Sequence, residues 1–563
     1  MEILITIALL LGLVYFRFER EIHIALNNQH FWFFAIVSCI LGYTIYFIAG
    51  HFWEKLKNKV LILRQGLGKF DKKKELNIPF ISFNLEKKLI QSKDLFKDKT
   101  FLGLDAETKN KDTVCVDDNQ RCHHMQILGM TGTGKTESIF LPLVYQDAIK
   151  NRPIIIIDAK GEMSFIQKLN ALLKRIGRED DFMLFSLAYK ELSCSYNPLY
   201  VGECDPQIIV DAFFNNFTDE NSFYRNTAKT IFTNAFGVLH SLGKPFTVMD
   251  VYTYLTNNQA RMSINGKVKG GEGVLHLKIL NEIISTHAKR DESWKQVLAG
   301  FYNYLLDHKD PILNVDDPDI VLTDIIKNRK IVYFQLPTNA YPVQAKSIAR
   351  MIQANLRYIS SLIQIGKIEK DILVSVIIDE YASFAEESFV EVLNKARSSG
   401  MMVTLSHQSL SDLKNISEPF MKRIDENTLN KIYLKQTDPE LCELVAKSFG
   451  TYEHIESTLR KAPGKFGNAV STGETSNRRV KEFYFHPDRV KHLNSPGQGW
   501  FIYRGNNSKS CVNFGYFQNV KGGEYKKKEK TNRKKGLRIF EEYYMKKNSQ
   551  EKVINNPEEI ETV

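Results

Sequence analysis

Gly129-Met130-Thr131-Gly132-Thr133-Gly134-Lys135-Thr136 fits the pattern G-x-x-x-x-G-K-[ST] at every fixed position. The stretch follows an apolar run, Met125-Gln126-Ile127-Leu128, and precedes a segment, 137–150, that can form a helix. Glycines let a backbone fold tightly around an anion, and the dipole of the following helix adds positive potential. A chance surface turn would lack this strand–loop–helix context. We therefore predict a loop that binds ATP, with Lys135 on the β- and γ-phosphates and the Thr136 hydroxyl on Mg²⁺.

Further apolar runs along the chain predict buried strands that alternate with helices, which is typical of an α/β domain with a parallel sheet. These runs are Ile154–Ile157, Val332–Leu336, Val374–Ile378, Met402–Leu405 and Lys431–Leu434. Residues 205–310 instead show helical spacing, for example Ile209, Phe213 and Phe217, and Thr247 to Asp250 resembles a capped helix start. We predict an all-helical domain over 205–310, inserted into a nucleotide-binding domain formed by 96–204 and 311–520.

The first residues predict a membrane anchor over 1–54. Residues 30–50 contain about twenty consecutive uncharged positions, enough for a helix to cross a bilayer core of roughly 30 Å. Residues 3–17 suit a shorter first span and fit a cleaved signal peptide less well, since Glu2 replaces the usual basic start. Lysines after the second span place both ends in the cytoplasm, so we expect a multi-pass protein of the inner membrane with its nucleotide site in the cytoplasm. Residues 55–95 then form a juxtamembrane linker.

The charge of the chain favours a polyanionic partner or an anionic membrane surface. The 563 residues carry a formal net charge of +11, although ordinary solvation also accounts for such an excess. Lysines at 55–59 suit lipid headgroups. Residues 521–563 are first basic and then acidic, with few apolar positions, and predict a flexible tail. The seven cysteines lie scattered, as expected of reduced intracellular thiols, and Cys122-His123-His124 is better explained by a structural role than by metal binding.

Hydrolysis of a bound nucleotide requires a carboxylate for the metal and a group that orients water. Val374 to Ile378 ends in Asp379-Glu380, and two adjacent acids can divide these tasks. We assign Asp379 to the Mg²⁺ shell and Glu380 to activation of the attacking water. Asp158 also ends a run of isoleucines, but it lacks the acidic pair, so we assign it a structural or secondary role.

Two further polar residues are candidates for sensing the terminal phosphate. Gln408 follows the strand that comes next along the chain, where its neutral amide can bridge water and phosphate. Arg397 lies on the helix between these strands, and its planar cation can stabilise a transferring phosphoryl group across a subunit boundary. The alternatives are a strand-end cap for Gln408 and a solvated helix residue for Arg397.

Taken together, these motifs resemble the type IV coupling proteins of conjugation and type IV secretion, within the FtsK/HerA-like branch of RecA-fold motors. The resemblance runs from the two spans to about residue 515. Its elements, in chain order, are Phe101-Leu102-Gly103, the phosphate loop, Asp158-Ala159-Lys160-Gly161-Glu162, Ser195-Tyr196-Asn197-Pro198-Leu199, Asp379-Glu380, Ala396-Arg397 and Gln408-Ser409. It implies a RecA-like domain with an all-helical domain, a homo-hexameric ring, and catalytic roles for Lys135, Asp379, Glu380, Arg397 and Gln408.

The resemblance also implies a function. Such an ATPase couples processed single-stranded DNA, bound by a relaxase, to the secretion channel, and its Lys and Arg residues would contact single- or double-stranded DNA without sequence preference. A motor that moves protein effectors and a receptor that uses nucleotide only as a switch are the alternatives. Glu380 argues against the pure switch, which needs no acid to activate water.

Overall fold

The computed structural model describes residues 42, 78–92, 94–200, 206–214, 217, 222–287, 292–463, 469–493 and 495–545. The chain divides into two compact units, Met1–Leu76 and Asn77–Val563, and the described fold is that of the second. The spans predicted at 3–17 and 30–50 lie, except for Gly42, outside the described residues. Within those residues, no helix combines the length and apolar character needed to cross a bilayer.

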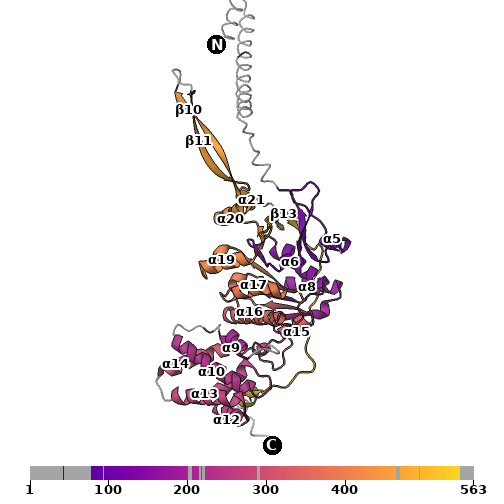
Figure 1. Cartoon of the computed structure of the whole chain (residues 1–563). Coiled ribbons are helices and arrows are strands. Elements are labelled where there is room, and N and C mark those ends of the chain that lie inside the picture. The colour runs from indigo at the N-terminus through magenta and orange to yellow at the C-terminus, as the bar shows by residue number, and fades with distance from the viewer. Residues whose placement is uncertain are drawn as a thin grey trace, which may run out of the picture. The chain divides into compact units, whose positions relative to one another are not determined.

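An eleven-stranded mixed sheet forms the centre of the fold, in the order β2-β1-β13-β12-β9-β3-β8-β7-β4-β6-β5 (Figure 1). The strands are β1 (Lys99–Asp105), β2 (Thr113–Asp117), β3 (Met125–Leu128), β4 (Ile154–Asp158), β5 (Phe182–Ser186), β6 (Ile331–Gln335), β7 (Val374–Asp379), β8 (Met401–His407), β9 (Asn430–Leu434), β12 (Gln498–Tyr503) and β13 (Ser508–Phe514). From β9 to β5 all pairs are parallel, which agrees with the sequence-based expectation. The half from β2 to β12 is antiparallel, so the prediction of a purely parallel sheet was wrong there.

Both faces of the parallel half are buried, and this explains its continuous apolar strands. Along β4, Ile154 and Ile156 belong to one apolar cluster, whereas Ile155 and Ile157 belong to another on the opposite face. Because successive side chains of a strand point to opposite faces, a strand covered on both sides needs apolar residues at every position. The parallel arrangement also places the carboxyl ends of β3, β4, β7 and β8 at one edge of the sheet.

Helices cover both faces of the main sheet. The helices associated with the sheet are α5 (Leu85–Gln91), α6 (Asp118–Arg121), the π-helical turn η1 (Lys135–Phe140), α7 (Leu141–Ile149), α8 (Met163–Arg175), α15 (Leu322–Lys327), α16 (Pro342–Gln364), α17 (Phe389–Ala396), α18 (Leu410–Lys414), α19 (Glu418–Asn427), α20 (Pro439–Phe449) and α21 (Asp488–Lys491). α7 and α8 contribute to the cluster that contains Ile154, and α16 and α17 to the cluster that contains Ile155.

Among the described residues, six α-helices lie within the range 205–310, where helical periodicity predicts an insertion. They are α9 (Pro206–Phe214), α10 (Ser222–His240), α11 (Val248–Thr256), α12 (Asn258–Asn265), α13 (Glu272–His287) and α14 (Glu292–Leu306). Thr247 caps α11 in a reciprocal capping box with Asp250, as the sequence predicts. Phe213, Phe232 and Phe301 belong to the same apolar cluster as Ile155 of the sheet. The helical region therefore shares its core with the sheet.

A second, two-stranded sheet is formed by β10 (Thr451–Pro463) and β11 (Ala469–Phe483), which pair in antiparallel fashion. Figure 1 shows this hairpin in orange, extending away from the main sheet beyond α20 and α21. No motif or periodicity in the sequence predicts it.

Part of the segment predicted as a juxtamembrane linker over 55–95 packs against the sheet. Asn84 caps α5 by accepting a hydrogen bond from the Lys87 amide, and Leu85 and Leu89 are buried in the cluster that contains Ile154. A backbone bridge joins Asn84 to Tyr516, just after β13. The described part of the predicted linker thus belongs to the folded domain.

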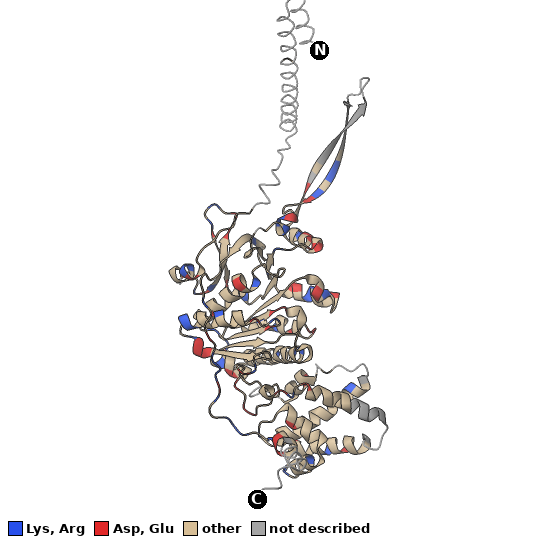
Figure 2. Ribbon diagram, turned by 180° about the vertical axis from the view of Figure 1, so that it is seen from behind, with Lys and Arg blue, Asp and Glu red and all other residues tan. Residues whose placement is uncertain are grey.

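The prediction of a flexible tail from residue 521 was wrong for residues 521–545. Tyr525 and Ile539 are buried, and the basic side chains of this segment pair with acidic residues that precede α15. These contacts are Lys530 with Asp317 at 2.5 Å, Arg533 with Asp319 at 2.6 Å and Arg538 with Asp316 at 3.1 Å. The segment continues to the helical region, where the Phe540 amide donates to Asp250. Figures 1 and 2 show it passing from the sheet to the helices as a long coil.

Tyr525→Ala is expected to lower the free energy of unfolding by about 3 kcal/mol, because it removes a buried aromatic ring. The ring packs edge-on against Phe182, and its hydroxyl accepts a hydrogen bond from the Leu184 amide at 2.9 Å. Tyr484→Ala is the control, since that side chain is largely exposed. Urea unfolding of the detergent-solubilised chain measures both variants; equal stability of the two would show that the segment contributes nothing.

Candidate functional site

The phosphate loop follows β3, whose neighbours in the sheet are β9 and β8. Gly132 and Gly134 have φ values of 80° and 97°, in the left-handed region that favours glycine. A Cβ at position 134 would also lie 2.9 Å from the amide nitrogen of Gly497. That amide donates to the carbonyl of Thr133 at 2.9 Å, so the turn before β12 is hydrogen-bonded to the loop. The loop is thus held in a conformation that side chains at its glycines would disrupt.

Lys135 begins the helical turn η1 and is buried inside the loop. Its ammonium group donates to the carbonyl of Gly129 and lies 3.9 Å from a carboxylate oxygen of Glu380. Burial lowers the pKa of Lys135, while the charges of Glu380 and Asp379 act in the opposite direction. A cation in this position needs anions nearby, and nucleotide phosphates would provide them.

Asp379 and Asp158 end the neighbouring strands β7 and β4 and are paired in register. The Asp379 carboxylate accepts hydrogen bonds from the Ser406 hydroxyl and from the Glu380 amide. Burial raises the pKa of Asp379 to about 6, and the nearby charge of Asp158 acts in the same direction. Two buried carboxylates that repel each other favour a bound cation. Oxygen ligands of this kind suit Mg²⁺, so Asp379 and the Thr136 hydroxyl fit the metal predicted from the sequence.

Glu380 comes directly after β7 and reaches across to the phosphate loop. Its φ is 49°, which is uncommon for a residue other than glycine and is typical of functional sites. One oxygen of its carboxylate accepts from Lys160 at 2.5 Å and from the Gln408 amide at 3.3 Å. Gln408 itself is exposed. The structure therefore brings Lys135 together with Asp379, Glu380 and Gln408, which lie more than 240 positions further along the sequence but were predicted to share its site.

Comparisons with known proteins agree with this geometry. The family described as the TraM recognition site of TraD and TraG matches residues 373–495, a range that includes Asp379, Glu380 and Gln408. The type 4 coupling protein DotL of Legionella pneumophila is 22% identical over 408 residues, which are 62% of this chain and 52% of DotL. The chain is thus similar to type IV coupling proteins. It spans about half the length of this curated relative.

Solved plasmid coupling proteins have a similar fold. The plasmid coupling protein TrwB with a non-hydrolysable GTP analogue aligns with a TM-score of 0.52 and 15% identity, covering 80% of this chain and 98% of TrwB. TrwB in complex with ADP and Mg²⁺ aligns with a TM-score of 0.50 and 15% identity, covering 73% of this chain and 88% of TrwB. At this identity the likeness concerns the fold alone.

Arg397 does not join the site of its own chain. It is exposed and lies on the turn η5 (Arg397–Ser399), just before β8 begins. Because β8 is parallel to β3, the start of β8 lies at the opposite edge of the sheet from the phosphate loop. Its charge lowers the pKa of His123, after the larger effect of burial. The role of Arg397 across a subunit boundary therefore stays a prediction.

His124 contributes to packing next to Arg397. It is fully buried, one ring nitrogen lies 2.8 Å from the Leu393 carbonyl, and the other accepts from the Val403 amide at 3.3 Å. Burial lowers the pKa of His124 to about 4. Both ring nitrogens thus have protein partners, which is the structural role predicted for this part of the Cys-His-His sequence.

Sequence reasoning missed several residues around the nucleotide site. A hollow of about 580 Å³ opens beside the loop and is lined by Thr136, Lys160, Phe80, Pro496 and Tyr516, among others. Phe80 and Tyr516 come from opposite ends of the described chain, and no motif marks them. Lys160 stands in the D-x-K-G-E element, but only the folded chain shows its contact with Glu380. The aromatic and proline side chains give this hollow an apolar wall next to the phosphate loop.

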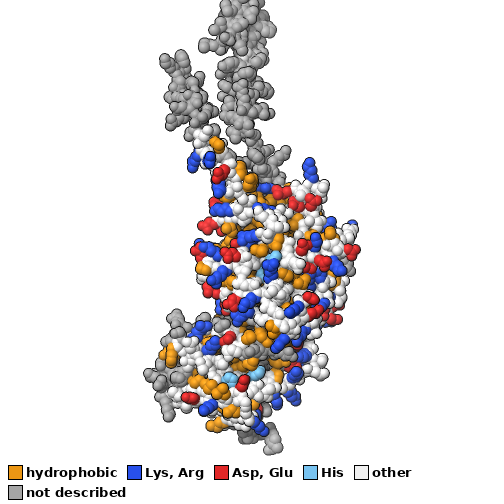
Figure 3. Space-filling view, in the orientation of Figure 1, with side chains coloured by type: hydrophobic (Ala, Val, Ile, Leu, Met, Phe, Trp, Pro, Cys, Tyr) orange, Lys and Arg blue, Asp and Glu red, His pale blue; other side chains and the backbone are white. Residues whose placement is uncertain are grey.

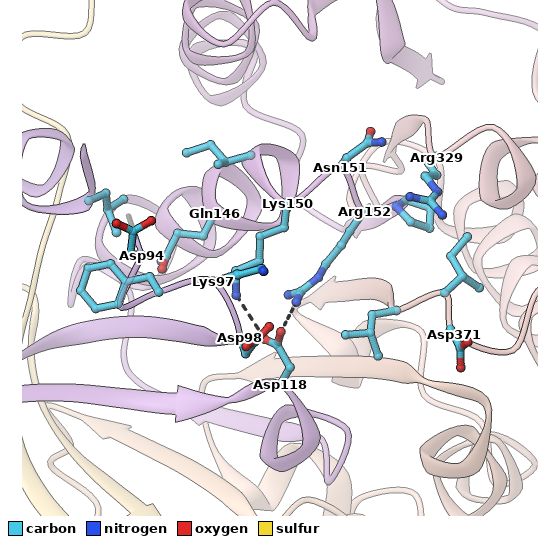
Figure 4. Close-up of a pocket in the computed structure, with 16 residues that line it drawn as sticks. Asp94, Lys97, Asp98, Asp118, Gln146, Lys150, Asn151, Arg152, Arg329 and Asp371 are labelled. Carbon is cyan, nitrogen blue, oxygen red and sulfur yellow. Dashed lines mark hydrogen bonds and ion pairs between the residues drawn. The ribbon is translucent and has the colours of Figure 1, made fainter. Parts of the chain in front are cut away.

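A second hollow, of about 540 Å³, includes Pro153 and Leu373, which precede β4 and β7, and so lies at the opposite edge of the sheet (Figure 4). Two of its cations already have anionic partners. Lys150 lies 3.2 Å from Asp118, and Arg152 pairs with Asp118 and, at 2.8 Å, with the buried Asp147. A phosphate would have to compete with these carboxylates. The phosphate loop, whose amides and lysine face the first hollow, is therefore the better site for a nucleotide.

Proposed function

We propose that the chain is an inner-membrane ATPase that couples relaxase-bound single-stranded DNA to a type IV secretion channel and powers its transfer. The observation that supports hydrolysis best is the position of Glu380. A carboxylate next to the metal-side acid Asp379, within 3.9 Å of the phosphate-loop lysine, is suited to orient and deprotonate a water that attacks the terminal phosphate. A protein that used nucleotide only as a switch would not need this group.

The other site residues divide the remaining tasks. The amides of residues 129–136 and the Lys135 ammonium would bind the phosphates, and Thr136 and Asp379 would hold Mg²⁺, which supplies positive charge to the site when bound. Lys160 pairs with Glu380 at 2.5 Å and so holds its carboxylate beside the phosphate loop. Gln408 donates to Glu380 and is exposed enough to contact water as well. These residues bind, orient and deprotonate without any covalent intermediate.

Assembly into a homo-hexameric ring would give Arg397 its partner. Its exposed position at the far edge of the sheet excludes a role in its own site but leaves it free to reach a neighbouring subunit. An arginine supplied in this way stabilises charge in the transition state and is associated with effects of about 10³–10⁵-fold on turnover.

Arg397→Ala is expected to lower ATP turnover at least about 100-fold without weakening ATP binding, as removal of a group that acts in the transition state would. Mixing Arg397→Ala subunits with Lys135→Ala subunits should restore part of the turnover, because some sites then combine an intact loop with an intact arginine. Arg423→Ala, at another exposed arginine, is the control. Steady-state hydrolysis of the mixture measures the effect; no recovery on mixing would exclude action between subunits.

The choice of DNA as cargo rests on charge and on family. The net charge of +11 favours a polyanion. On the face that Figure 3 shows, however, Lys and Arg are mixed with Asp and Glu, so contacts to phosphates need not form on the outer surface. The match to a TraM recognition site supports docking to proteins of the DNA-transfer machinery.

The test is ATP hydrolysis by the full chain in lipid nanodiscs, with and without single-stranded DNA. We expect DNA of any sequence to stimulate hydrolysis, and the stimulation to fall as salt rises, because phosphate contacts release counterions. Stimulation by an effector protein and not by DNA would favour the protein-cargo alternative. Turnover no higher than that of Glu380→Gln would overturn hydrolysis itself.

A further inference from the structure

A chain of buried hydrogen bonds crosses the sheet beneath the nucleotide site. Lys431 on β9 donates to the side-chain oxygen of Gln126 on β3 at 2.5 Å. The Gln126 amide nitrogen lies 2.7 Å from Nε2 of His407 at the end of β8. Nδ1 of His407 lies 2.7 Å from the carbonyl oxygen of Ser409. Lys431, Gln126 and His407 are all completely buried, and none of them contributes to the phosphate chemistry described above.

The donors and acceptors of this chain of hydrogen bonds allow only one orientation of the Gln126 amide and one tautomer of His407. Lys431 also donates to Asp425 and to Thr428, each at 2.8 Å, so it presents protons to Gln126, whose oxygen must face it. The amide nitrogen of Gln126 then faces His407 and can only donate, which makes Nε2 of His407 the acceptor. The proton of the neutral ring is therefore on Nδ1, where it is donated to the Ser409 carbonyl. Burial, the largest effect, lowers the pKa of His407 to about 4, in agreement with a neutral ring.

The chain of hydrogen bonds ends at the backbone next to Gln408. The Ser409 side chain and Asp412 form a capping box at the start of α18, which fixes the residue after Gln408 on its helical side. The side-chain amide of Gln436 donates to the backbone carbonyl of Gln408 at 3.3 Å. His407 holds the Ser409 carbonyl on the strand side. Gln408 is thus an exposed side chain on a backbone that is restrained by three separate contacts.

Strand β8 supports both acids of the site. Ser406 donates to Asp379, and Gln408 donates to Glu380. His407 lies between Ser406 and Gln408 in the sequence. Because side chains of a strand alternate, it faces the buried hydrogen bonds instead of the acids. A small rotation of the backbone at His407 would therefore change the position of the Gln408 amide relative to Glu380.

We propose that His407 is a positioning residue, which fixes Gln408 against Glu380 through its hydrogen bond to the Ser409 carbonyl, with Gln126 and Lys431 setting the orientation of its ring. This inference rests on the proposed hydrolysis and on the part that Gln408 plays in it. His407 is completely buried, so its effect appears in turnover and passes through Gln408.

Two substitutions separate positioning from packing. In His407→Asn, the amide nitrogen can occupy the place of Nδ1 and donate to Ser409. In His407→Gln, the amide reaches the place of Nε2 and leaves the Ser409 carbonyl without its donor. For the full chain in nanodiscs, we expect kcat to fall about tenfold in His407→Gln and less than about threefold in His407→Asn, with the KM for ATP unchanged in both. Equal losses in the two variants, or a change in KM alone, would overturn the proposal.

A double-mutant cycle shows whether His407 acts through Gln408. His407→Gln is expected to have no further effect on kcat when Gln408 is already alanine, because the group to be positioned is absent. Additive losses would contradict the proposal. If His407→Gln does not fold, as judged by its thermal midpoint, Gln126→Leu replaces it, since it removes the middle link and leaves His407 and Ser409 in place.

The same measurements include wild type and Glu380→Gln. If wild type does not exceed Glu380→Gln in turnover, the proposed hydrolysis fails. If hydrolysis depends on Glu380 but the cycle at 407 and 408 is additive, hydrolysis stands and the positioning role of His407 fails.

Discussion

Glu380→Gln is expected to lower ATP turnover by about 10²–10⁴-fold, the usual contribution of a general base, while ATP binding stays at least as tight as in the wild type. The substitution keeps the shape of the side chain and removes only its charge. An amide cannot take the proton of an attacking water. It also no longer repels the terminal phosphate, so the bound state gains rather than loses stability.

The contacts of Glu380 make this variant suitable. Its oxygen accepts from Lys160 and from Gln408, and the amide oxygen of glutamine can accept from the same donors. The matched control is Glu391→Gln on α17, where the side chain is 60% exposed and lies 3.8 Å from Arg357. Its turnover should equal that of the wild type.

Two measurements check the prediction. Equilibrium binding of a fluorescent ATP analogue gives the affinity, and phosphate release gives the turnover. If Glu380→Gln releases phosphate at the rate of the wild type, another group activates the water and Glu380 has only an electrostatic role.

The parts of the site that lie in short contiguous motifs could be predicted from the sequence. The phosphate loop carries its own glycines, lysine and threonine, so its conformation is encoded within eight residues. The strand that ends in Asp379 is buried at every position and mostly apolar, because both faces of the sheet are covered. Since parallel strands end at the same edge, the acids that follow them had to meet the loop. This reasoning extends to Gln408 but not to Arg397, which precedes its strand.

Contacts between distant segments could not be predicted in this way. The turn at Ser495-Pro496-Gly497 supports the phosphate loop from more than 360 positions away, and only the folded chain shows that a Cβ at Gly134 would meet the Gly497 amide and a Cβ at Gly497 the Ser138 side chain. Local composition contains no information about such a partner. The antiparallel strands β12 and β13 pair locally with each other, but their outer neighbours, β9 and β1, come from distant parts of the chain.

The C-terminal segment shows how composition can mislead. Clusters of lysine and arginine with few apolar residues are typical of solvated, flexible chain. Here the basic residues face an acidic stretch at Asp316, Asp317 and Asp319, and two apolar anchors, Tyr525 and Ile539, are buried. The charges compensate each other across more than 200 positions, which no local window of sequence can detect. Several basic side chains of this segment are therefore paired with acids of the same chain.

Lys135→Ala is expected to abolish ATP turnover and to weaken ATP binding by at least about 10–100-fold, which corresponds to the loss of charge-assisted hydrogen bonds of about 1.5–3 kcal/mol. The loss of affinity for ATP should exceed that expected for an average phosphate-binding lysine, because acidic side chains remain beside the position of the lost ammonium group. Asp379 and Glu380 both lie close enough to affect the pKa of Lys135, and without its charge they repel an incoming nucleotide. Lys160 still pairs with Glu380 but leaves the buried Asp379 less compensated.

The same substitution should leave the fold intact. Burial disfavours the charged form of Lys135, so removing the ammonium group takes away an unfavourable desolvation together with one hydrogen bond to Gly129. We expect the thermal midpoint without nucleotide to change little, and the stabilisation by ATP and Mg²⁺ seen in the wild type to disappear. Lys447→Ala, at a lysine that is 63% exposed on α20, is the control and should keep that stabilisation. Thermal unfolding with and without ATP and Mg²⁺ measures both; a Lys135→Ala chain that ATP still stabilises would place the nucleotide elsewhere.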